Sequence, residues 1–412
     1  MTILWRGWHS PDLQAALKAT WFANDLLVLC PYHLHDFSFL RALPESRVVF
    51  AGDWDQTTKA RALEFQPKGN SAQFAEQPVI AIFTSGSMSG TPRLVLYSKR
   101  NILCSLDGVR SFFDTSRIKK IFCYPQPLHT FGFSLGYVHA MLKGLELVAA
   151  SGRYSSAAHD LWFSSVDENT LTLGVPTHFS DLIKVADRRN VPNSYSCIIG
   201  GAPVSVALWH QARSILKIEA PSIGYGATEC APGVTHLGAG VAPTENGEIG
   251  IALPGVEFTK VNEGVRVKGD NVCVAQYDGE KLTFGREAIL SDSVKLKSGG
   301  GWVYQGRTDH LINRGGLKFQ LETIEDFLDK KHGVRAVCVA VKDERLGDDL
   351  AIVAEPTKVA VQQIYRDLES HFHTRFDSKK FYTLAALPVN ASNKIDRREC
   401  QKALENSEQV LI

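Results

Sequence analysis

A loop of hydroxyl and glycine residues follows a short apolar run, and these residue types after a strand can bind an anion. The run Val79–Phe83 is typical of a buried strand, and the loop after it reads TSGSMSGTPR from Thr84 to Arg93. Glycines leave backbone N–H groups unhindered and hydroxyls add donors, so such a loop can wrap a phosphate. It is not a Walker A loop, because no Gly-Lys-Ser/Thr follows. Taken alone, it is more often an ordinary surface turn.

Several later segments combine glycine, proline or polar residues at the ends of apolar runs. In chain order they are Pro127-Leu128-His129 with Phe131-Gly132, Gly200-Gly201-Ala202-Pro203, Tyr225-Gly226-Ala227-Thr228-Glu229, Ser291-Asp292, Gly306-Arg307-Thr308-Asp309, and LPVNASNKIDRREC over residues 387–400. Each has a structural explanation by itself, because glycine and proline form turns. The order of the set is therefore more informative than any one member.

Taken in that order, the segments resemble the motifs of the adenylate-forming superfamily. This superfamily includes acyl-CoA synthetases, peptide-synthetase adenylation domains and firefly-type luciferases. The likeness runs from about Val79 to Cys400, and independent coincidence of all the segments in the right order is implausible. Among the subfamilies, the compact chain most resembles o-succinylbenzoate–CoA ligase of menaquinone synthesis, although no substrate-specific motif is clear.

The chain departs from the family pattern at three positions. The loop from Thr84 fits the pattern Ser/Thr-Ser-Gly-Ser/Thr-Thr-Gly-x-Pro-Lys if Met88 is an extra residue, and Arg93 replaces the lysine. Arginine keeps the positive charge but presents a planar fork instead of a point charge. Asn393 stands where the family has a glycine, and asparagine tolerates positive φ better than most residues.

The resemblance implies that a carboxylic acid reacts with ATP to give an acyl-adenylate and pyrophosphate, and that a thiol then attacks the adenylate. Two anions must approach, so the protein has to neutralise charge and position groups. By motif match, Lys394 would bridge the α-phosphate and the carboxylate, and Thr228 would contact the α-phosphate. Glu229 would hold Mg²⁺, which prefers oxygen ligands. Outside its motif, Lys394 would be interpreted as a solvated surface lysine.

The same match assigns the remaining site residues. The catalytic set is Lys394, Thr228, Glu229, Arg307 and His129. The ATP-binding set is Thr84, Ser85, Gly86, Ser87, Ser89, Gly90, Arg93, Gly201, Ala202, Tyr225, Gly226, Thr228, Asp292, Arg307 and Lys394. The acid pocket is His129, Phe131, Gly200, Gly224 and Cys230; the coenzyme A tunnel is Arg314, Gly315 and Gly316; the hinge is Asp309. His129 is also compatible with a packed histidine, and the pocket residues with ordinary core.

The elements that would position these residues follow from the hydropathy pattern. Short apolar runs alternate with helical spacing from Val79 to Gly224, which is typical of a doubly wound parallel sheet. Ile121–Tyr124 is one such run, and Phe131–Lys143 and Thr177–Ala186 have helical spacing. Over about residues 245–305 the runs become β-rich and are split by turn residues, which indicates antiparallel hairpins. We therefore expect an α/β fold. The resemblance to the superfamily further implies that the N-terminal subdomain is abbreviated, and we expect the largest structural surprise before Val79.

The resemblance adds a domain division to this pattern. An AMP- and acid-binding domain is expected over residues 1–308, and a small, mobile α+β domain over residues 309–412. The small domain would rotate about Asp309 between the two half-reactions and would carry Lys394.

The amino-acid composition indicates the broad class of protein to which the chain belongs. The 412 residues carry a net charge of +1, with 44% hydrophobic and 22% charged residues, which is ordinary for a globular protein. A charge near zero gives no general attraction to nucleic acid or anionic membranes. Arg6, His9 and Asp12 interrupt any signal-peptide core, and no apolar stretch approaches the length of a membrane span. The eight cysteines include no CxxC pair, so we expect reduced thiols and a cytoplasmic protein.

Three hypotheses for the function remain open. The leading hypothesis is an AMP-forming carboxylic acid–CoA ligase that uses ATP, Mg²⁺ and coenzyme A. The second is an acid–AMP ligase that loads a carrier-protein thiol. The third is an inert, ligase-like nucleotide-binding protein, which the departures at Met88, Arg93 and Asn393 keep open. The sequence does not give the acid or the oligomeric state, monomer or homodimer.

Overall fold

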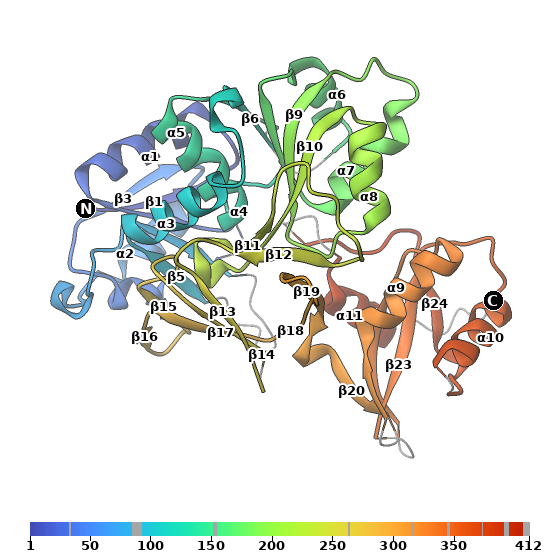
Figure 1. Ribbon diagram of the computed structural model, residues 1–412. Helices are drawn as coiled ribbons and strands as arrows, with labels where there is room; N and C mark the ends of the chain where they lie inside the picture. The colour runs from blue at the N-terminus through green and yellow to red at the C-terminus, as the bar shows by residue number, and fades with distance from the viewer. Residues whose placement is uncertain are drawn as a thin grey trace. The chain divides into compact units, whose positions relative to one another are not determined.

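The computed structural model describes residues 1–32, 34–84, 93–150, 155–262, 264–314, 317–343, 347–372, 374–390 and 395–406 (Figure 1). The chain divides into two compact units. Unit 1 is Met1–Thr259, Arg266–Leu290 and Leu296–Val303, and unit 2 is Lys260–Val265, Ser291–Lys295 and Tyr304–Ile412. The functional domain boundary at Asp309 stays a prediction.

The first sheet of unit 1 contains most of the N-terminal region. Its strand order is β16-β15-β5-β4-β2-β1-β3, and β1, β2, β3 and β4 are joined by parallel pairings. The strands are β1 (Thr2–Arg6), β2 (Leu26–Leu29), β3 (Val48–Gly52), β4 (Ile80–Phe83), β5 (Leu94–Tyr97), β15 (Ala275–Tyr277) and β16 (Leu282–Phe284). The residues before Val79 therefore supply three strands of this sheet. The sequence indicates β2, because residues 21–32 have a possible helix-to-strand pattern, and it leaves β1 and β3 unresolved.

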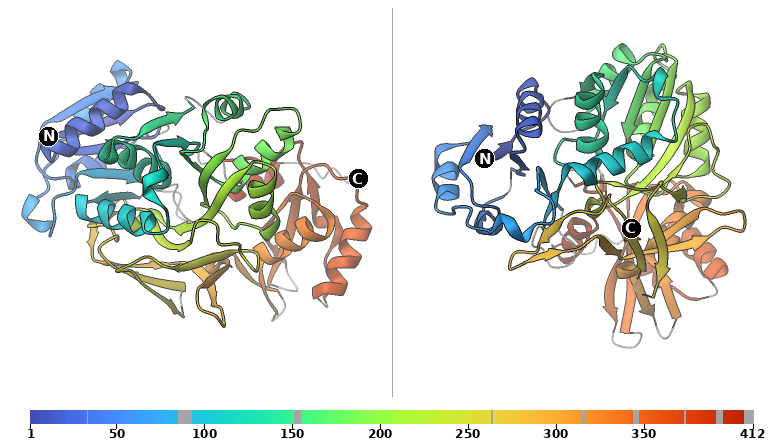
Figure 2. Two further views of the ribbon diagram at one scale, coloured as in Figure 1. Left: turned by 45° about the horizontal axis from the view of Figure 1, so that its top comes forward. Right: turned by 60° about the vertical axis from the view of Figure 1, so that its left-hand side comes forward.

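Local sequence explains the first helix of this region. The side chain of Ser10 caps α1 (Pro11–Ala23) by accepting a hydrogen bond from the Leu13 amide at 3.3 Å, and proline occupies the first turn. Asn24 ends the helix in the left-handed conformation, with φ of 57°. The blue segment in Figure 2 contains α1 and strands β1 to β3. The helix α2 (Gln56–Leu63) follows β3.

The second sheet is the predicted doubly wound one. Its strands β7, β6, β8, β9 and β10 are parallel, and β11 and β12 continue it antiparallel. They are β6 (Lys120–Cys123), β7 (Glu146–Ala149), β8 (Thr170–Gly174), β9 (Ser194–Gly200), β10 (Ile218–Gly226), β11 (Gly233–Leu237) and β12 (Glu248–Ala252). The helices α6 (Ala157–Ser165), α7 (Pro176–Ala186) and α8 (Val206–Ser214) cover one face, where Phe122, Trp162 and Trp209 are buried (Figure 1).

The other face of this sheet is covered by α3 (Lys99–Arg110) and by the segment Thr130–Lys143. The sequence predicts one helix over residues 131–143. The structure has instead α4 (Thr130–Gly132), a π-helical turn (Phe133–Val138) and α5 (His139–Lys143). Such wide turns are rare and often occur at functional sites.

The β-rich stretch forms hairpins as expected. The strands are β13 (Glu257–Val261), β14 (Gly264–Lys268), β17 (Glu287–Leu290), β18 (Asp292–Leu296) and β19 (Trp302–Arg307). In β19, Trp302 and Val303 pair with β12. The sheet order β13-β14-β17 is separate from the two large sheets.

Unit 2 is a small α+β unit. Its strands are β20 (Leu311–Arg314), β21 (Leu317–Gln320), β22 (Ala336–Asp343), β23 (Gly347–Ala354) and β24 (Phe381–Thr383). Its helices are α9 (Leu321–His332), α10 (Val361–Phe372) and α11 (Arg397–Asn406). Alternate residues of β22 and β23 enter two separate apolar clusters, one containing Ile324 and Leu368, the other containing Leu387 and Cys400. The sheet is therefore buried on both faces.

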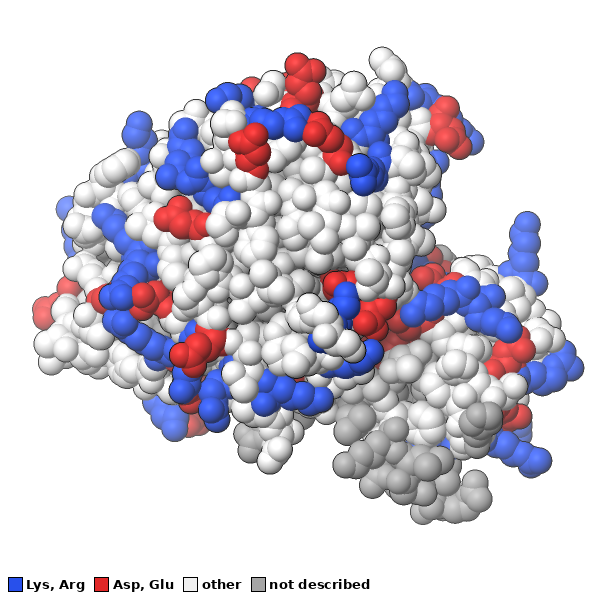
Figure 3. Space-filling model, in the orientation of Figure 1, with Lys and Arg blue, Asp and Glu red and all other residues white. Residues whose placement is uncertain are grey.

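The surface carries mixed charge. On the face drawn in Figure 3, basic and acidic side chains alternate instead of forming a patch of one sign. None of the helices among the described residues is long and apolar enough to cross a bilayer.

Candidate nucleotide and acid site

The two ends of the predicted phosphate loop lie side by side. The amide of Thr84, directly after β4, donates to the carbonyl of Arg93 at 2.8 Å, and the Arg93 amide donates to the Thr84 hydroxyl at 3.3 Å. Both residues are half-buried. The loop therefore leaves and re-enters the sheet at one point. Ser85, Gly86, Ser87, Ser89 and Gly90 lie outside the described residues.

The segment predicted to contact the α-phosphate and the metal is a short 3₁₀ turn, Thr228–Cys230, after β10. The Tyr97 hydroxyl donates to the carbonyl of Thr228, and the Cys273 amide donates to the carbonyl of Glu229 at 2.9 Å. Burial raises the pKa of Tyr97 well above its ordinary value, so this hydroxyl remains a donor. Tyr97 lies on β5, the strand that follows the phosphate loop, and thus links the loop to the turn.

Glu229 is the predicted magnesium ligand, and this role stays a prediction. Glu229 is half-buried, and within the described residues no hydrogen bond or ion pair engages its carboxylate. Those residues contain no group of three His, Cys, Asp or Glu that could hold a metal ion by itself. A single carboxylate fits Mg²⁺ when phosphate oxygens and water complete the shell.

Three of the predicted acid-pocket residues meet at the carboxyl ends of β9 and β10. Gly200 and Gly224 are register partners in the parallel pair. A Cβ atom on Gly200 would lie 2.8 Å from the Gly224 carbonyl oxygen and 3.6 Å from the ring of Phe131. Only glycine fits this approach of two strands. This edge of a parallel sheet is where ligands bind in open α/β folds.

The other unit 1 residues of the predicted site surround this edge. Gly201 has a φ of +79°, and it and Ala202 are exposed at the end of β9. Tyr225 is half-buried and Gly226 is exposed at the end of β10, whereas Cys230 is fully buried. The half-buried His129 precedes α4, and the Phe133 amide donates to its carbonyl at 2.8 Å. The chemical role of His129 stays a prediction.

In unit 2 the predicted ribose-binding pair is close together. Arg307 Nη1 lies 3.7 Å from Asp292 Oδ1, and the Thr308 amide donates to the Ser291 carbonyl at 2.8 Å. The backbone of Asp309 belongs to the 3₁₀ turn Thr308–His310. Lys394 lies outside the described residues.

Arg314, predicted for the coenzyme A tunnel, makes structural contacts instead of facing open space. It is 8% exposed, and its Nε donates to Asp349 Oδ1 at 2.5 Å. Its guanidinium also lies 5.1 Å from the centre of the Phe376 ring. The tunnel assignment stays a prediction, and Gly315 and Gly316 lie outside the described residues.

The structure adds two residues that the sequence reasoning missed. Tyr97 and Cys273 hold the backbone of the turn at Thr228 and Glu229. Neither residue carries a local signal, because their role depends on which strands become neighbours. Of the residues that form or hold this turn, those of the motif Tyr225–Glu229 were recognisable in the sequence.

The geometry agrees with a comparison against protein families. Residues 33–277 match the model described as AMP-binding enzyme. The chain belongs to the AMP-binding enzyme family. The match begins well before Val79, so the family likeness includes part of the N-terminal sheet.

Similar curated proteins include two ligases. The chain is 26% identical to the mitochondrial medium-chain acyl-CoA ligase ACSF2 of Mus musculus over 360 residues, 80% of this chain and 58% of that protein. It is 22% identical to the D-alanine–D-alanyl carrier protein ligase of Lactococcus lactis over 374 residues, 83% and 72% of the two chains. The naringenin synthase of Pestalotiopsis fici is matched over 10% of its length. This chain thus spans less than two thirds of several relatives.

Solved structures of the same fold include the o-succinylbenzoate CoA synthetase MenE from Bacillus subtilis in complex with OSB-AMP. The TM-score is 0.75 at 17% identity, covering 100% of this chain and 89% of that one. ATP-bound MatB from Rhodopseudomonas palustris gives 0.76 at 17% identity, covering 98% and 89%. At these identities the likeness establishes the fold.

Proposed function

We propose that this chain is an ATP-dependent, AMP-forming ligase that activates a carboxylic acid as its acyl-adenylate and transfers the acyl group to a thiol. The observation that carries the proposal is the connection from the closed phosphate loop, through Tyr97 on β5, to the turn with Thr228 and Glu229. This connection joins the two ends of the predicted phosphate loop to the turn that carries Glu229, and β10, which leads to this turn, also contains Gly224 of the glycine-lined edge. Family membership supports the same reaction class.

Each group of residues would have one task in the first half-reaction. The loop from Thr84 to Arg93 binds the β- and γ-phosphates, while Glu229 holds Mg²⁺, which neutralises phosphate charge when bound. Tyr225 stacks on the adenine beside Gly201 and Ala202. In unit 2, Asp292 accepts hydrogen bonds from the ribose hydroxyls and Arg307 donates to ribose or phosphate. Lys394 stabilises the charge that develops as the carboxylate attacks the α-phosphate.

For the second half-reaction we propose coenzyme A as the acceptor, with Arg314, Gly315 and Gly316 along its path and Asp309 as the hinge. The solved MenE structure of the same fold makes o-succinylbenzoate a candidate acid. Loading of a carrier-protein thiol is the second candidate, and the likeness to a carrier protein ligase over 72% of its length favours testing it. In both cases the protein would act as a cytoplasmic enzyme.

The decisive experiment is pyrophosphate release across a panel of carboxylic acids, with and without coenzyme A, using the Lys394→Ala variant for comparison. We expect acid-dependent release, and we expect Lys394→Ala to slow adenylation by about a hundredfold or more, as for loss of a key electrostatic donor. Thiolation of preformed adenylate should survive in this variant. Lys379→Ala, at an exposed lysine of the same unit, is the matched control and should behave as wild type.

Three outcomes would decide between the candidates. Pyrophosphate release that needs no coenzyme A, followed by acyl transfer to a carrier protein alone, would favour the carrier-loading ligase. No release with any acid would favour an inert nucleotide-binding protein. Equal damage to both half-reactions in Lys394→Ala would remove Lys394 from the adenylation step.

A further inference from the structure

The hydroxyl of Tyr97 joins parts of unit 1 that belong to two different sheets. Tyr97 ends β5 of the first sheet, and its side chain is fully buried. The hydroxyl bonds the carbonyl of Thr228, which follows β10 of the second sheet. It also lies 3.3 Å from the hydroxyl of Thr130, the first residue of the segment Thr130–Lys143, which we call the acid-side segment. One buried hydroxyl therefore contacts both the predicted nucleotide turn and this segment.

The directions of the two hydrogen bonds follow from the groups that make them. A tyrosine hydroxyl has one hydrogen to donate and can also accept, whereas a carbonyl oxygen can only accept. The Tyr97 hydrogen must therefore go to the Thr228 carbonyl, so Thr130 donates its own hydrogen to the Tyr97 oxygen. Thr130 is 4% exposed. The result is a buried chain of two hydrogen bonds in which each bond polarises and strengthens the other.

Each end of this chain lies next to residues predicted for the site. Thr130 stands between His129 and Phe131, and the ring of Phe131 lies beside the glycine-lined edge of β9 and β10. At the other end, Thr228 is followed directly by Glu229 in one 3₁₀ turn. The chain thus connects the backbone that carries the predicted acid-pocket residues with the backbone that carries the predicted α-phosphate and metal contacts.

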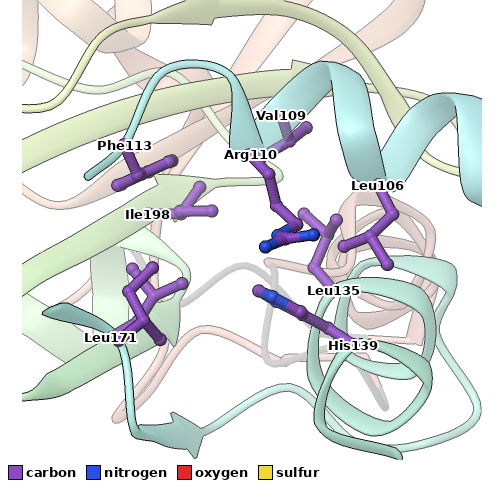
Figure 4. A pocket seen from close by; sticks show the side chains of 9 residues that line it. Leu106, Val109, Arg110, Phe113, Leu135, His139, Leu171 and Ile198 are labelled. Carbon is purple, nitrogen blue, oxygen red and sulfur yellow. The ribbon is translucent and has the colours of Figure 1, made fainter. Parts of the chain in front are cut away.

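The acid-side segment contacts the same part of the chain a second time. The helix α3 begins two residues after Tyr97, so β5 and α3 form one continuous support. Figure 4 shows Leu106 and Arg110 of α3 directed toward Leu135 and His139 of the acid-side segment, around a small pocket. The segment is therefore fixed by packing along its later turns and by the Tyr97 hydroxyl at its start.

The proposed adenylation needs this kind of control, because its two substrates would be held by different sheets. The phosphate loop leaves from β4 of the first sheet, whereas the glycine-lined edge belongs to β9 and β10 of the second. The carboxylate must approach the α-phosphate closely and in line, and a displacement of about 1 Å can cost on the order of a hundredfold in rate. A hydrogen-bond chain between the sheets sets how the two substrates face each other.

We propose that Tyr97 and Thr130 are positioning residues that fix the acid relative to the α-phosphate during adenylation. The inference rests on the proposed ligase function and adds the acid side to it. The two residues act through the backbone of Thr228 and through the placement of the acid-side segment. In the acyl-adenylate the acyl group and the phosphate are joined covalently, so the intermediate then supplies this alignment itself. The pair should therefore matter for adenylation and much less for thiolation.

The first test measures both half-reactions for Tyr97→Phe, with ATP and the acid that wild type adenylates fastest in the pyrophosphate-release panel. We expect kcat for adenylation to fall by about tenfold to a hundredfold, because the reacting groups are misaligned. The KM values for ATP and acid, and the rate of thiolation of preformed adenylate, should change by less than about threefold. A smaller amount of folded enzyme would lower both half-reactions by the same factor, so their ratio separates positioning from folding.

The matched control is Tyr137→Phe. Tyr137 lies on the same acid-side segment, is 2% exposed, and makes a hydrogen bond of 2.9 Å between its hydroxyl and His9 Nδ1. This variant also loses the hydroxyl of a buried tyrosine, but it leaves the chain from Thr130 to Thr228 intact. The ratio of the two half-reactions should therefore stay as in wild type.

A second set of variants tests the donor at the start of the chain. Thr130→Val removes the hydroxyl at similar shape and should slow adenylation by a smaller factor than Tyr97→Phe, because the bond from Tyr97 to Thr228 persists. Thr130→Ser keeps the donor and should restore most of the rate. The two losses should be less than additive in the variant that combines Tyr97→Phe with Thr130→Val, since both break one chain. Full additivity would contradict the chain.

The outcomes separate this inference from the proposed function. If wild type adenylates an acid and Tyr97→Phe lowers both half-reactions equally, or changes neither, the inference is overturned and the ligase function stands. The same holds if Tyr137→Phe shifts the ratio as strongly as Tyr97→Phe does. If wild type adenylates no acid, the proposed function fails and the inference fails with it.

Discussion

Two half-buried arginines, one in each unit, differ in how completely they are paired. Arg397 in unit 2 donates from Nη1 to Glu325 Oε1 at 2.5 Å and from Nη2 to Glu325 Oε2 at 3.2 Å, and it also bonds the carbonyl of Cys338. Glu322 lies 3.6 Å from the same guanidinium. Arg110 in unit 1 has a buried Nε without a partner in the described residues and one long contact with Asp107.

The difference separates a charge that is fully paired within unit 2 from one whose pairing in unit 1 is incomplete among the described residues. A buried charge is costly unless its partners are complete, and the contacts of Arg397 meet that condition within the chain. They join the start of α11 to α9 and β22, and therefore stabilise unit 2 itself. Among the described residues, the contacts of Arg110 do not complete such a set, because its buried Nε has no partner and Asp107 lies 3.6 Å from Nη1. Substitutions that remove each arginine should therefore differ in how far they lower stability.

The tryptophans make the two units separately observable. All seven, Trp5, Trp8, Trp21, Trp54, Trp162, Trp209 and Trp302, lie in unit 1. Tryptophan fluorescence therefore reports the unfolding of unit 1, whereas far-ultraviolet circular dichroism reports both units.

The largest effect is expected for Arg397→Met. Glu325 would keep a buried carboxylate without its partner, and the loss of one member of a buried pair costs about 3–5 kcal/mol. Urea unfolding should show a destabilised transition by circular dichroism, while the fluorescence transition of unit 1 changes little. The control is Arg398→Met at the exposed neighbouring residue. Similar midpoints for the two variants would contradict a structural role of the Arg397 pair.

An intermediate effect is expected for His236→Leu and depends on pH. Burial lowers the pKa of His236 to about 3, below its ordinary value near 6.5. Between these values the unfolded chain holds a proton that the folded chain lacks, so stability is full above about pH 6.5 and falls as pH decreases toward 3. This residue contributes a slope of up to about 1.4 kcal/mol per pH unit.

The measurement compares wild type and His236→Leu by urea unfolding, followed by tryptophan fluorescence, at several pH values between 4 and 7, roughly the window of the shifted histidine. The variant should gain stability relative to wild type as pH falls. The difference isolates His236 from His139 and His178, whose pKa values burial also lowers, to about 4 and about 3. A constant difference across the range would show that His236 is protonated or solvated in the folded state.

The smallest effect on stability is expected for Arg110→Met. The variant replaces an incompletely paired guanidinium by an apolar chain, so the free energy of unfolding should change by less than about 1 kcal/mol, in either direction. Tryptophan fluorescence in urea measures this for unit 1. A loss of stability comparable to that of Arg397→Met would show that Arg110 stabilises unit 1 as strongly as Arg397 stabilises unit 2, and would contradict the contrast between the two arginines.

The local pattern predicted much of the second sheet and little of the first. The apolar run at Ile121–Tyr124 became β6 of the second sheet and the helical spacing at Thr177–Ala186 became α7, whereas the run at Val79–Phe83 became β4 of the first sheet. The strands β1 and β3 were missed because each is short and lies in a region without clear alternation of strands and helices. The π-helical turn at Phe133–Val138 was also missed, since a helical pattern does not distinguish its wider turn.

The sequence by itself determined the family, the alternation of strands and helices, and the motifs at Thr84, Gly200 and Tyr225, because periodicity and turn chemistry are properties of neighbouring residues. The tertiary structure alone decided which distant residues meet. It places Tyr97 against Thr228, and Arg110 beside His139. These contacts depend on strand order and helix packing, which join residues far apart in the chain and leave no local trace in the sequence.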